Sequence, residues 1–306
     1  MLNKILCVIA LGLLVGWGDL RAQAPAGDAK IKGRIIAARV EGTVTVVSKS
    51  GGESRVLHEK DTLTDGTRVI TAPGASVILI FSNGASVNVA PDSTLDIDEF
   101  EQDPFASDVK VAELRQEPTT SVTKLSIAKG ELVGKVVHLN IDKGSEFTVQ
   151  TPVGAAGIRG TTFRIVFRPS KDGKSYRFSL TTADGRVVFT GRTSAPLEIP
   201  AGKQVVVDFE ASGDLFNPLT SVQVTDAFGM DIADIESIAQ QIQTFTATTI
   251  FLAPQGSGPG GPKPVVPHSQ ASGSDQSPQD TPVPPPVIPP VQPTPTPVDP
   301  VTGSGP

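Results

Sequence analysis

The side chains that most often carry out catalytic or metal chemistry are few and scattered in this sequence. The three histidines are His58, His138 and His268, and none belongs to a metal-ligand motif. The single cysteine, Cys7, lies in an apolar run near the amino terminus, and no Gly-x-Ser-x-Gly element marks a serine nucleophile. We therefore predict that the protein is not an enzyme and has no catalytic residue, metal site or cofactor.

A run of acidic residues between positions 92 and 103 raises the alternative of a calcium site. Asp96 and Asp98 alternate with Leu95 and Ile97, which is the pattern of a strand with one solvated face. The run has neither the ligand spacing nor the turn glycine of a calcium-binding loop. We expect these carboxylates to be solvated and not metal-bound.

A glycine-rich segment, Gly154-Ala-Ala-Gly-Ile-Arg-Gly160, invites comparison with phosphate-binding loops. It lacks the Gly-Lys-Ser/Thr ending of such loops, and an expected strand follows it where they have a helix. Tight turning and close backbone packing account for Gly157 and Gly160, with Arg159 paired to a carboxylate. The alternative is that Arg159 binds an anionic ligand.

Short strands must position most of these residues. β-branched runs separated by Gly, Pro, Asp or Asn recur between residues 30 and 210, which is typical of an antiparallel β-sandwich or β-roll. In Ser82-Asn83-Gly84-Ala85, we expect Asn83 and Gly84 to supply the two positive-φ positions of a tight hairpin turn. Residues 101–121 interrupt the pattern and are expected to form an inserted surface loop with a helical turn. The expected strands are 34–40, 43–48, 67–72, 76–81, 85–90, 94–99, 123–128, 131–139, 146–150, 161–168, 176–182, 187–190 and 204–209.

The pattern changes after the strand region. Between residues 211 and 253, Ile235, Ile238 and Ile242 have helical spacing, which predicts one amphipathic helix that packs on the sheet or binds a partner. Residues 254–306 contain more than half of the 27 prolines and no aromatic residue. We predict that they form a disordered proline-rich tail, either a spacer or a recognition segment.

Residues 1–24 have the three parts of a secretory signal peptide. Lys4 precedes the apolar run from Ile5 to Val15, and Ala22-Gln-Ala24 supplies the small residues of a cleavage site. The apolar run is shorter than the ~20 residues that span a bilayer, so we expect cleavage near Ala24. The mature protein would then be periplasmic or secreted, without cysteine and without a stable membrane span.

Two blocks of the sequence resemble the FecR domain of bacterial envelope proteins. The first lies in three pieces between Leu63 and Leu95, and the second runs from Phe147 to Phe163. The resemblance covers roughly residues 30–210 and implies an extracytoplasmic all-β module, best known in regulators that relay the state of an outer-membrane receptor to a sigma factor. The family-motif residues, which we expect to be structural, are Asn83, Gly84, Pro152, Gly154, Gly157, Arg159, Gly160 and Thr161.

Those regulators carry a cytoplasmic anti-sigma segment and a membrane helix ahead of the domain, whereas here we expect only a cleavable signal peptide. We therefore predict a non-catalytic binding or scaffolding protein of the envelope, with a protein or polysaccharide partner. The alternatives are FecR-type cell-surface signalling through sigma-factor regulation, and an enzyme with an unrecognised site. The net charge of −6, with no basic face in the sequence, argues against nucleic acid as a partner.

Overall fold

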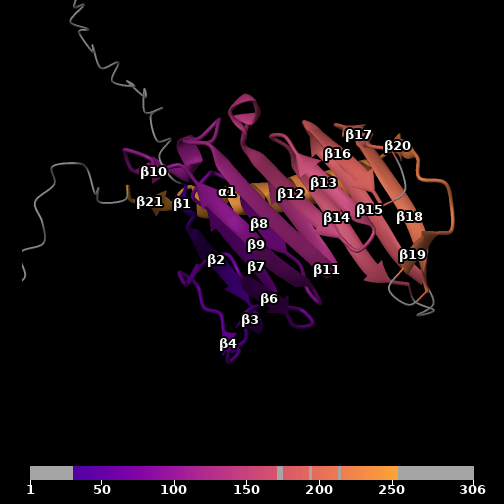
Figure 1. Cartoon of the computed structure of the whole chain (residues 1–306), viewed down its shortest axis with the longest axis horizontal. Helices are drawn as coiled ribbons and strands as arrows, with labels where there is room; N and C mark the ends of the chain where they lie inside the picture. The colour runs from indigo at the N-terminus through magenta and orange to yellow at the C-terminus, as the bar shows by residue number, and fades with distance from the viewer. Residues whose placement is uncertain (1–29, 171–174, 193–194, 213–214, 254–306) are drawn as a thin grey trace, which may run out of the picture. The chain divides into compact units, whose positions relative to one another are not determined.

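The computed structural model describes residues 30–170, 175–192, 195–212 and 215–253 (Figure 1). The expected signal peptide at 1–24 and the expected proline-rich tail at 254–306 lie outside the described residues. Within them, the chain forms two large sheets, a small two-stranded sheet and one α-helix. The predicted all-β, mainly antiparallel fold followed by one helix is confirmed.

The first sheet, sheet A, takes its strands from the part of the chain between Ile31 and Pro200. In hydrogen-bonding order its strands are β4 (Arg55–Val56), β3 (Val44–Ser48), β6 (Thr67–Thr71), β9 (Thr94–Gln102), β11 (Ser121–Lys135), β12 (Glu146–Thr151), β13 (Gly154–Ile158), β16 (Arg186–Gly191) and β17 (Leu197–Pro200), with β1 (Ile31–Lys32) beside the end of β9. All of these pairs are antiparallel except β11 with β12, which is parallel.

The second sheet, sheet B, is antiparallel throughout. In order its strands are β5 (Thr62–Leu63), β2 (Ile35–Glu41), β7 (Ser76–Phe81), β8 (Ser86–Val89), β11, β14 (Thr162–Pro169), β15 (Ser175–Asp184) and β18 (Lys203–Ser212), with β19 (Leu215–Pro218) and β20 (Val224–Asp226) both paired to β18.

The long strand β11 belongs to both sheets. Its first half, up to Lys129, pairs with β9 and β12, and its second half, from Gly130, pairs with β8 and β14. Gly130 has φ +110°, and a Cβ at this position would lie 2.1 Å from the Oγ of Ser93. Only glycine fits such a bend, so one continuous strand replaces the two that were predicted at 123–128 and 131–139.

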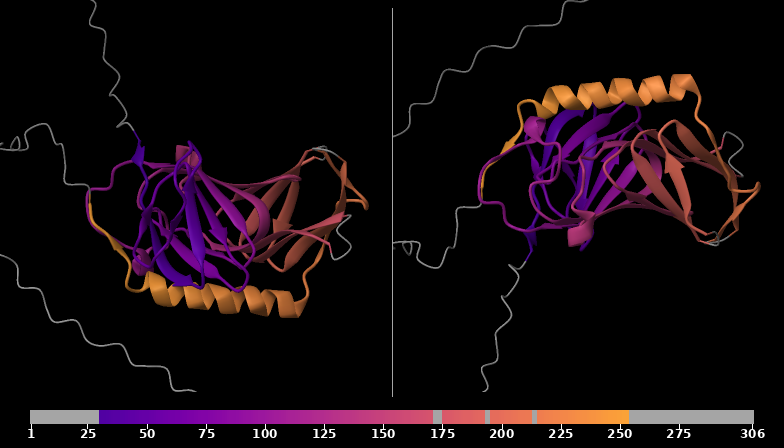
Figure 2. Two further views of the ribbon diagram at one scale, coloured as in Figure 1. Left: turned by 90° about the horizontal axis from the view of Figure 1, so that it is seen from below. Right: turned by 90° about the horizontal axis from the view of Figure 1, so that it is seen from above.

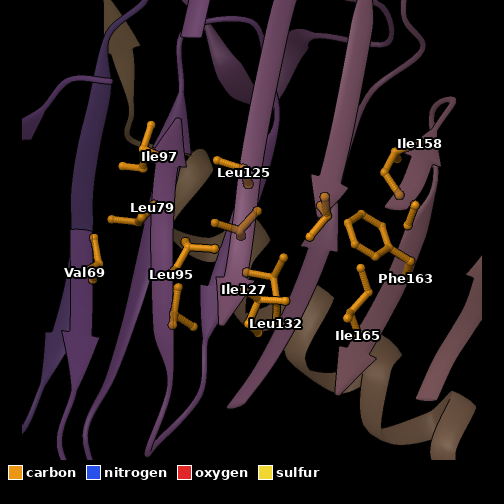
Figure 3. Packing of buried hydrophobic residues seen from close by; sticks show 14 of the residues in the cluster. Val69, Leu79, Leu95, Ile97, Leu125, Ile127, Leu132, Ile158, Phe163 and Ile165 are labelled. Carbon is orange, nitrogen blue, oxygen red and sulfur yellow. The ribbon is translucent and has the colours of Figure 1, made fainter. Parts of the chain in front are cut away.

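The main hydrophobic core lies between the two sheets. Strand alternation sends every second side chain inward, so aliphatic and phenylalanine side chains of both sheets join one buried cluster. Figure 3 shows part of it, including Leu95 and Ile97 on β9, Leu125 on β11 and Ile165 on β14. Both inner faces are buried and β11 links the two sheets, so the arrangement is a mostly antiparallel two-layer β fold, of the sandwich or roll kind that the alternating pattern predicted.

A second, smaller core lies on the outer side of sheet B, beneath the helix α1 (Gly229–Thr246). Ile235, Ala239 and Ile242 form the buried stripe of the helix, and Ile78 and Ile80 of β7 belong to the second core. Figure 2 shows α1 running along one face of the strands. The predicted amphipathic helix is therefore present, and it packs on the sheet.

The segment 101–121 is more ordered than a surface loop. β9 extends into it as far as Gln102, and a 3-10 turn, η1 (Val111–Glu113), follows the short strand β10 (Val109–Lys110). β10 pairs with β21 (Ile250–Phe251), and Phe105 is buried in the second core. The segment 101–121 is therefore ordered by β21, a strand about 140 residues further along the chain. A pairing over this distance leaves no signal in the local sequence.

Candidate binding site

Three connections cross between the two sheets side by side at one end of the sandwich. They join β11 to β12 through the 3-10 turn η2 (Ile141–Lys143), β13 to β14 at residues 159–161, and β15 to β16 at Gly185. A Cβ at Gly160 would lie 2.9 Å from the His138 Nδ1, and one at Gly185 would lie 2.5 Å from the Gly160 carbonyl oxygen. The three connections, called corners below, therefore contact one another. Their side chains lie on one surface.

An open groove of about 520 Å³ lies across these corners. Its lining residues come from the first two connections, from the first residue of β16 and from the segment before β11, and they include Gln116, His138, Asn140, Lys143, Arg159 and Arg186. Three of these six are lysine or arginine, and Asp142 is the one acidic residue among the lining residues. Although the chain is acidic overall, the groove is locally cationic.

Arg159 projects from the second corner and is exposed. The expected carboxylate partner is not found: among the described residues, Arg159 makes neither an ion pair nor a side-chain hydrogen bond. Lys143, also exposed, is likewise unpaired within the described part of the chain. Arg186 differs, because its Nη1 lies 3.2 Å from the Oε1 of Glu198. Arg159 and Lys143 are thus free to bind an anion.

The other residues of the glycine-rich block hold the corner in place. Pro152 begins the turn between β12 and β13, and a Cβ at Gly154 would lie 2.5 Å from the Thr190 carbonyl oxygen. Gly160 has φ +76°, and Thr161 is buried. Gly157 is different: it lies inside β13 and its Cβ would make only an ordinary contact of 3.7 Å. The block is therefore a strand with tight ends, where a chain reversal was expected.

A buried network of polar groups lies beneath the groove. Glu117, 4 % exposed, accepts hydrogen bonds from the hydroxyls of Ser121 (2.6 Å) and Ser145 and from the Asn140 backbone N–H (2.6 Å). Its backbone N–H donates to the His138 carbonyl oxygen at 2.9 Å. A buried carboxylate needs such partners, and these hydrogen bonds fix the groove wall to the sandwich.

Asn83 connects this network to the β7–β8 hairpin. Its Nδ2 donates to the Ser121 Oγ at 3.0 Å and to the Thr123 Oγ1 at 3.2 Å. The hairpin is present, but the predicted turn type is wrong, because Gly84 alone of the two residues has positive φ (+90°) and four residues separate β7 from β8. The Asn83 amide bonds the buried hydroxyls, and its Oδ1 accepts the Ala85 backbone N–H at 3.1 Å.

The acidic residues of β9 are less solvated than expected. Asp96 is buried and accepts two hydrogen bonds from the Arg68 guanidinium, at 2.6 and 2.8 Å. The Arg68 hydrogen bond and charge, helped by Lys49, hold the pKa of Asp96 below its ordinary value. Arg68 on β6 and Lys49, which directly follows β3, pair with carboxylates on this outer face, and strand alternation alone does not show these partners. Among the described residues, no group of three His, Cys, Asp or Glu side chains is placed to hold a metal.

Lys135 is a further cation without an ion pair among the described residues, and sequence reasoning missed it. It ends β11 beneath α1 and lines two hollows of about 370 and 390 Å³, both of which also involve Gln243. Burial lowers the pKa of Lys135, and the charge of Asp184 partly opposes this change. Neither Lys135 nor Lys143 belongs to a sequence motif. Their positions depend on pairings between strands that are far apart in the sequence, so the sequence alone did not single them out.

The comparisons with known proteins match one family. The model of the FecR protein family matches residues 67–188, a range that includes Gln116, Arg159 and every other residue lining the groove. No curated protein is similar enough to count as a match. No helix among the described residues has both the length and the apolar composition of a membrane span.

Two crystal structures of a Parabacteroides distasonis ATCC 8503 protein, provisionally described as an anti-sigma factor, are similar to this chain. They have 11 % and 12 % sequence identity and TM-scores of 0.37 and 0.38. Each alignment covers 54 % of this chain and 62 % of the other, so the chain spans less than two thirds of those proteins. Within this all-β fold, residues 67–188 are therefore the part of the chain that matches the FecR family.

Proposed function

We propose that this chain is an extracytoplasmic regulatory module that binds another envelope protein and contributes to FecR-type cell-surface signalling. The observation that carries the proposal is the FecR match over residues 67–188. That range contains the central strand β11 and all three corners, so the part of the fold that presents the groove is the part shared with the family. The signal-peptide pattern at residues 1–24 supports the extracytoplasmic location.

Binding is the activity that the groove supports. Arg159 and Lys143 offer positive charge to a partner, and the hydrogen bonds of Glu117 hold the surrounding wall in a fixed shape. A pre-formed, charged surface is suited to recognition. Scaffolding without signalling, which the sequence alone favoured, uses the same binding capacity, but the family match favours the regulatory role.

The two roles differ in what happens to transcription. In the host bacterium, deletion of the gene should change a small set of transcripts that share one promoter type, because the module would act through one sigma factor. Re-expression of the full chain should restore them, whereas a Gly130→Val variant, which cannot bend β11 past Ser93, should not. RNA sequencing of the four strains tests this. An unchanged transcript profile combined with a defective envelope would support scaffolding and reject the signalling role.

A further inference from the structure

Most cations on the two sheets already have carboxylate partners. Arg68, for example, pairs with Asp96 at 2.6 Å, and Arg177 pairs with Asp208 at 2.9 Å. Several cations, Lys135 among them, have no carboxylate partner among the described residues, and two of these, Arg159 and Lys143, line the same groove. Two unpaired cations from separate connections, brought together at one groove, point to an anion that comes from outside the chain.

The geometry points to a site for an acidic peptide segment: we propose that the groove recognises carboxylate side chains of a partner protein, with Arg159 and Lys143 as the binding cations. A guanidinium presents a planar fork of donors that matches a carboxylate, and an ammonium adds a point charge beside it. Arg186 contributes to the positive field, although Glu198 holds its side chain.

The remaining lining residues favour a peptide over a sugar. Gln116 and Asn140 carry carboxamides that can both donate to and accept from a peptide backbone, and Leu139 and Ile141 offer apolar contacts. No Phe, Tyr or Trp lines the groove, so it lacks the aromatic face on which a sugar ring stacks. Its volume of about 520 Å³ is also larger than one small anion requires and is within the usual range of ligand sites.

The groove is built to keep its shape without a ligand. Gly160 packs against His138, and the Asn140 backbone N–H is tied to the buried carboxylate of Glu117 at 2.6 Å. Little ordering entropy is therefore lost when a peptide binds. The inference deepens the proposed function by naming the chemistry of the partner, and it rests on that function only in taking the partner to be a protein.

The test is fluorescence anisotropy with the purified protein and a fluorescein-labelled peptide of Glu-Ser-Leu repeats. The comparison peptide has Gln-Ser-Leu repeats, which keep the size and remove the charge. The test variant combines Arg159→Gln and Lys143→Gln. The control combines Arg192→Gln and Lys60→Gln, which removes the same two kinds of exposed charge outside the groove; Arg192 follows the far end of β16 from Arg186. Circular dichroism melts establish that both variants fold.

We expect the Glu peptide to bind and the Gln peptide to bind at least about tenfold more weakly. The Arg159→Gln, Lys143→Gln variant should lose about tenfold in affinity, and the control less than about twofold. Equal binding by both variants, or by both peptides, would overturn the proposal. If pyrophosphate or polygalacturonate binds at Arg159 and the Glu peptide does not, the site is for a phosphate or an acidic glycan and the proposal is wrong.

The outcome separates this inference from the proposed function. If transcription depends on the chain but the Arg159→Gln, Lys143→Gln variant signals normally, the groove is not the recognition site and the function stands. If the groove binds the Glu peptide while deletion leaves transcription unchanged, the site stands and the signalling role fails.

Discussion

Glu117 and Arg159 lie at the same end of the sandwich, but Glu117 is buried and hydrogen-bonded whereas Arg159 is exposed. Glu117 is buried and accepts hydrogen bonds from Ser121, Ser145 and Asn140. Arg159 stands in the open groove above with no partner among the described residues. The buried carboxylate therefore serves the structure, and the exposed guanidinium is left available for an external ligand.

Substitution of Gly160 tests whether the connection between β13 and β14 requires glycine at this position. Gly160→Ala should lower the free energy of unfolding by roughly 1 to 2 kcal/mol, because φ is +76° and the new Cβ would press on His138. Gly157→Ala is the matched control and should change stability by less than about 1 kcal/mol, since its Cβ would make only an ordinary contact. Urea unfolding measures both. Equal effects of the two substitutions would contradict the assigned role of Gly160.

Asp96 should make stability depend on pH. Its pKa is lowered in the folded state by Arg68, so its contribution is fully present above the ordinary pKa of an unfolded aspartate, about 3.9, and is lost as pH falls through the lower folded value. Asp96→Asn should therefore be less stable than the wild type by about 1 kcal/mol at pH 7. The difference should shrink below about pH 4.

Urea unfolding across this pH range tests the prediction. Asp142→Asn is the control, because Asp142 is exposed and forms no ion pair with a described residue, so its effect should be small at every pH. A stability difference for Asp96→Asn that stayed constant from neutral to acidic pH would contradict the ion-pair account.

At the scale of elements, α1 closes the second core. Ile242→Ala should lower the free energy of unfolding of that region by about 2 to 5 kcal/mol, because Ile242 is fully buried with Ile78, Ile80 and Phe105. Gln241→Ala, on the exposed face of the same helix turn, should have an effect below about 0.5 kcal/mol. Hydrogen exchange at the α1 amides measures both changes, and unaltered protection in Ile242→Ala would show that α1 does not depend on this contact.

The strands and the helix that could be predicted from sequence are those whose own residue types and hydrophobic periodicity indicate them. The strand Ser76–Phe81 and the helix spacing of Ile235 and Ile242 follow from residue type and period. β13 was missed because Gly154-Ala-Ala-Gly-Ile158 has low strand propensity, and it is held as a strand by β12 and β16 on its two sides.

The candidate site was only partly predictable for the same reason. Arg159 stood out because it lies in a glycine-rich block, and its alternative role as an anion ligand could be stated from sequence. Lys143 and the Glu117 network could not be identified, because they meet Arg159 only through the strand order in sheets A and B. Contacts between residues far apart in sequence leave no local pattern.

At the scale of the molecule, the folded unit is larger than the FecR match. Residues 67–188 include β6 to β15, whereas β2 and β3 precede the match, and β18 and α1 follow it. β2 pairs with β7, β3 with β6 and β15 with β18, so these outer strands complete the sheets of the matched region. A test of function must therefore use the chain from residue 30 to at least residue 253.

The proposed role, regulation of transcription from outside the cytoplasm, can be tested by changing the compartment in which the chain accumulates. In the deletion strain, the full chain should restore the affected transcripts. The chain that begins at Pro25, without the expected signal peptide, should accumulate as a folded protein in the cytoplasm and restore nothing. If the cytoplasmic form restored the transcripts as well as the full chain did, the extracytoplasmic account of this FecR domain would be wrong.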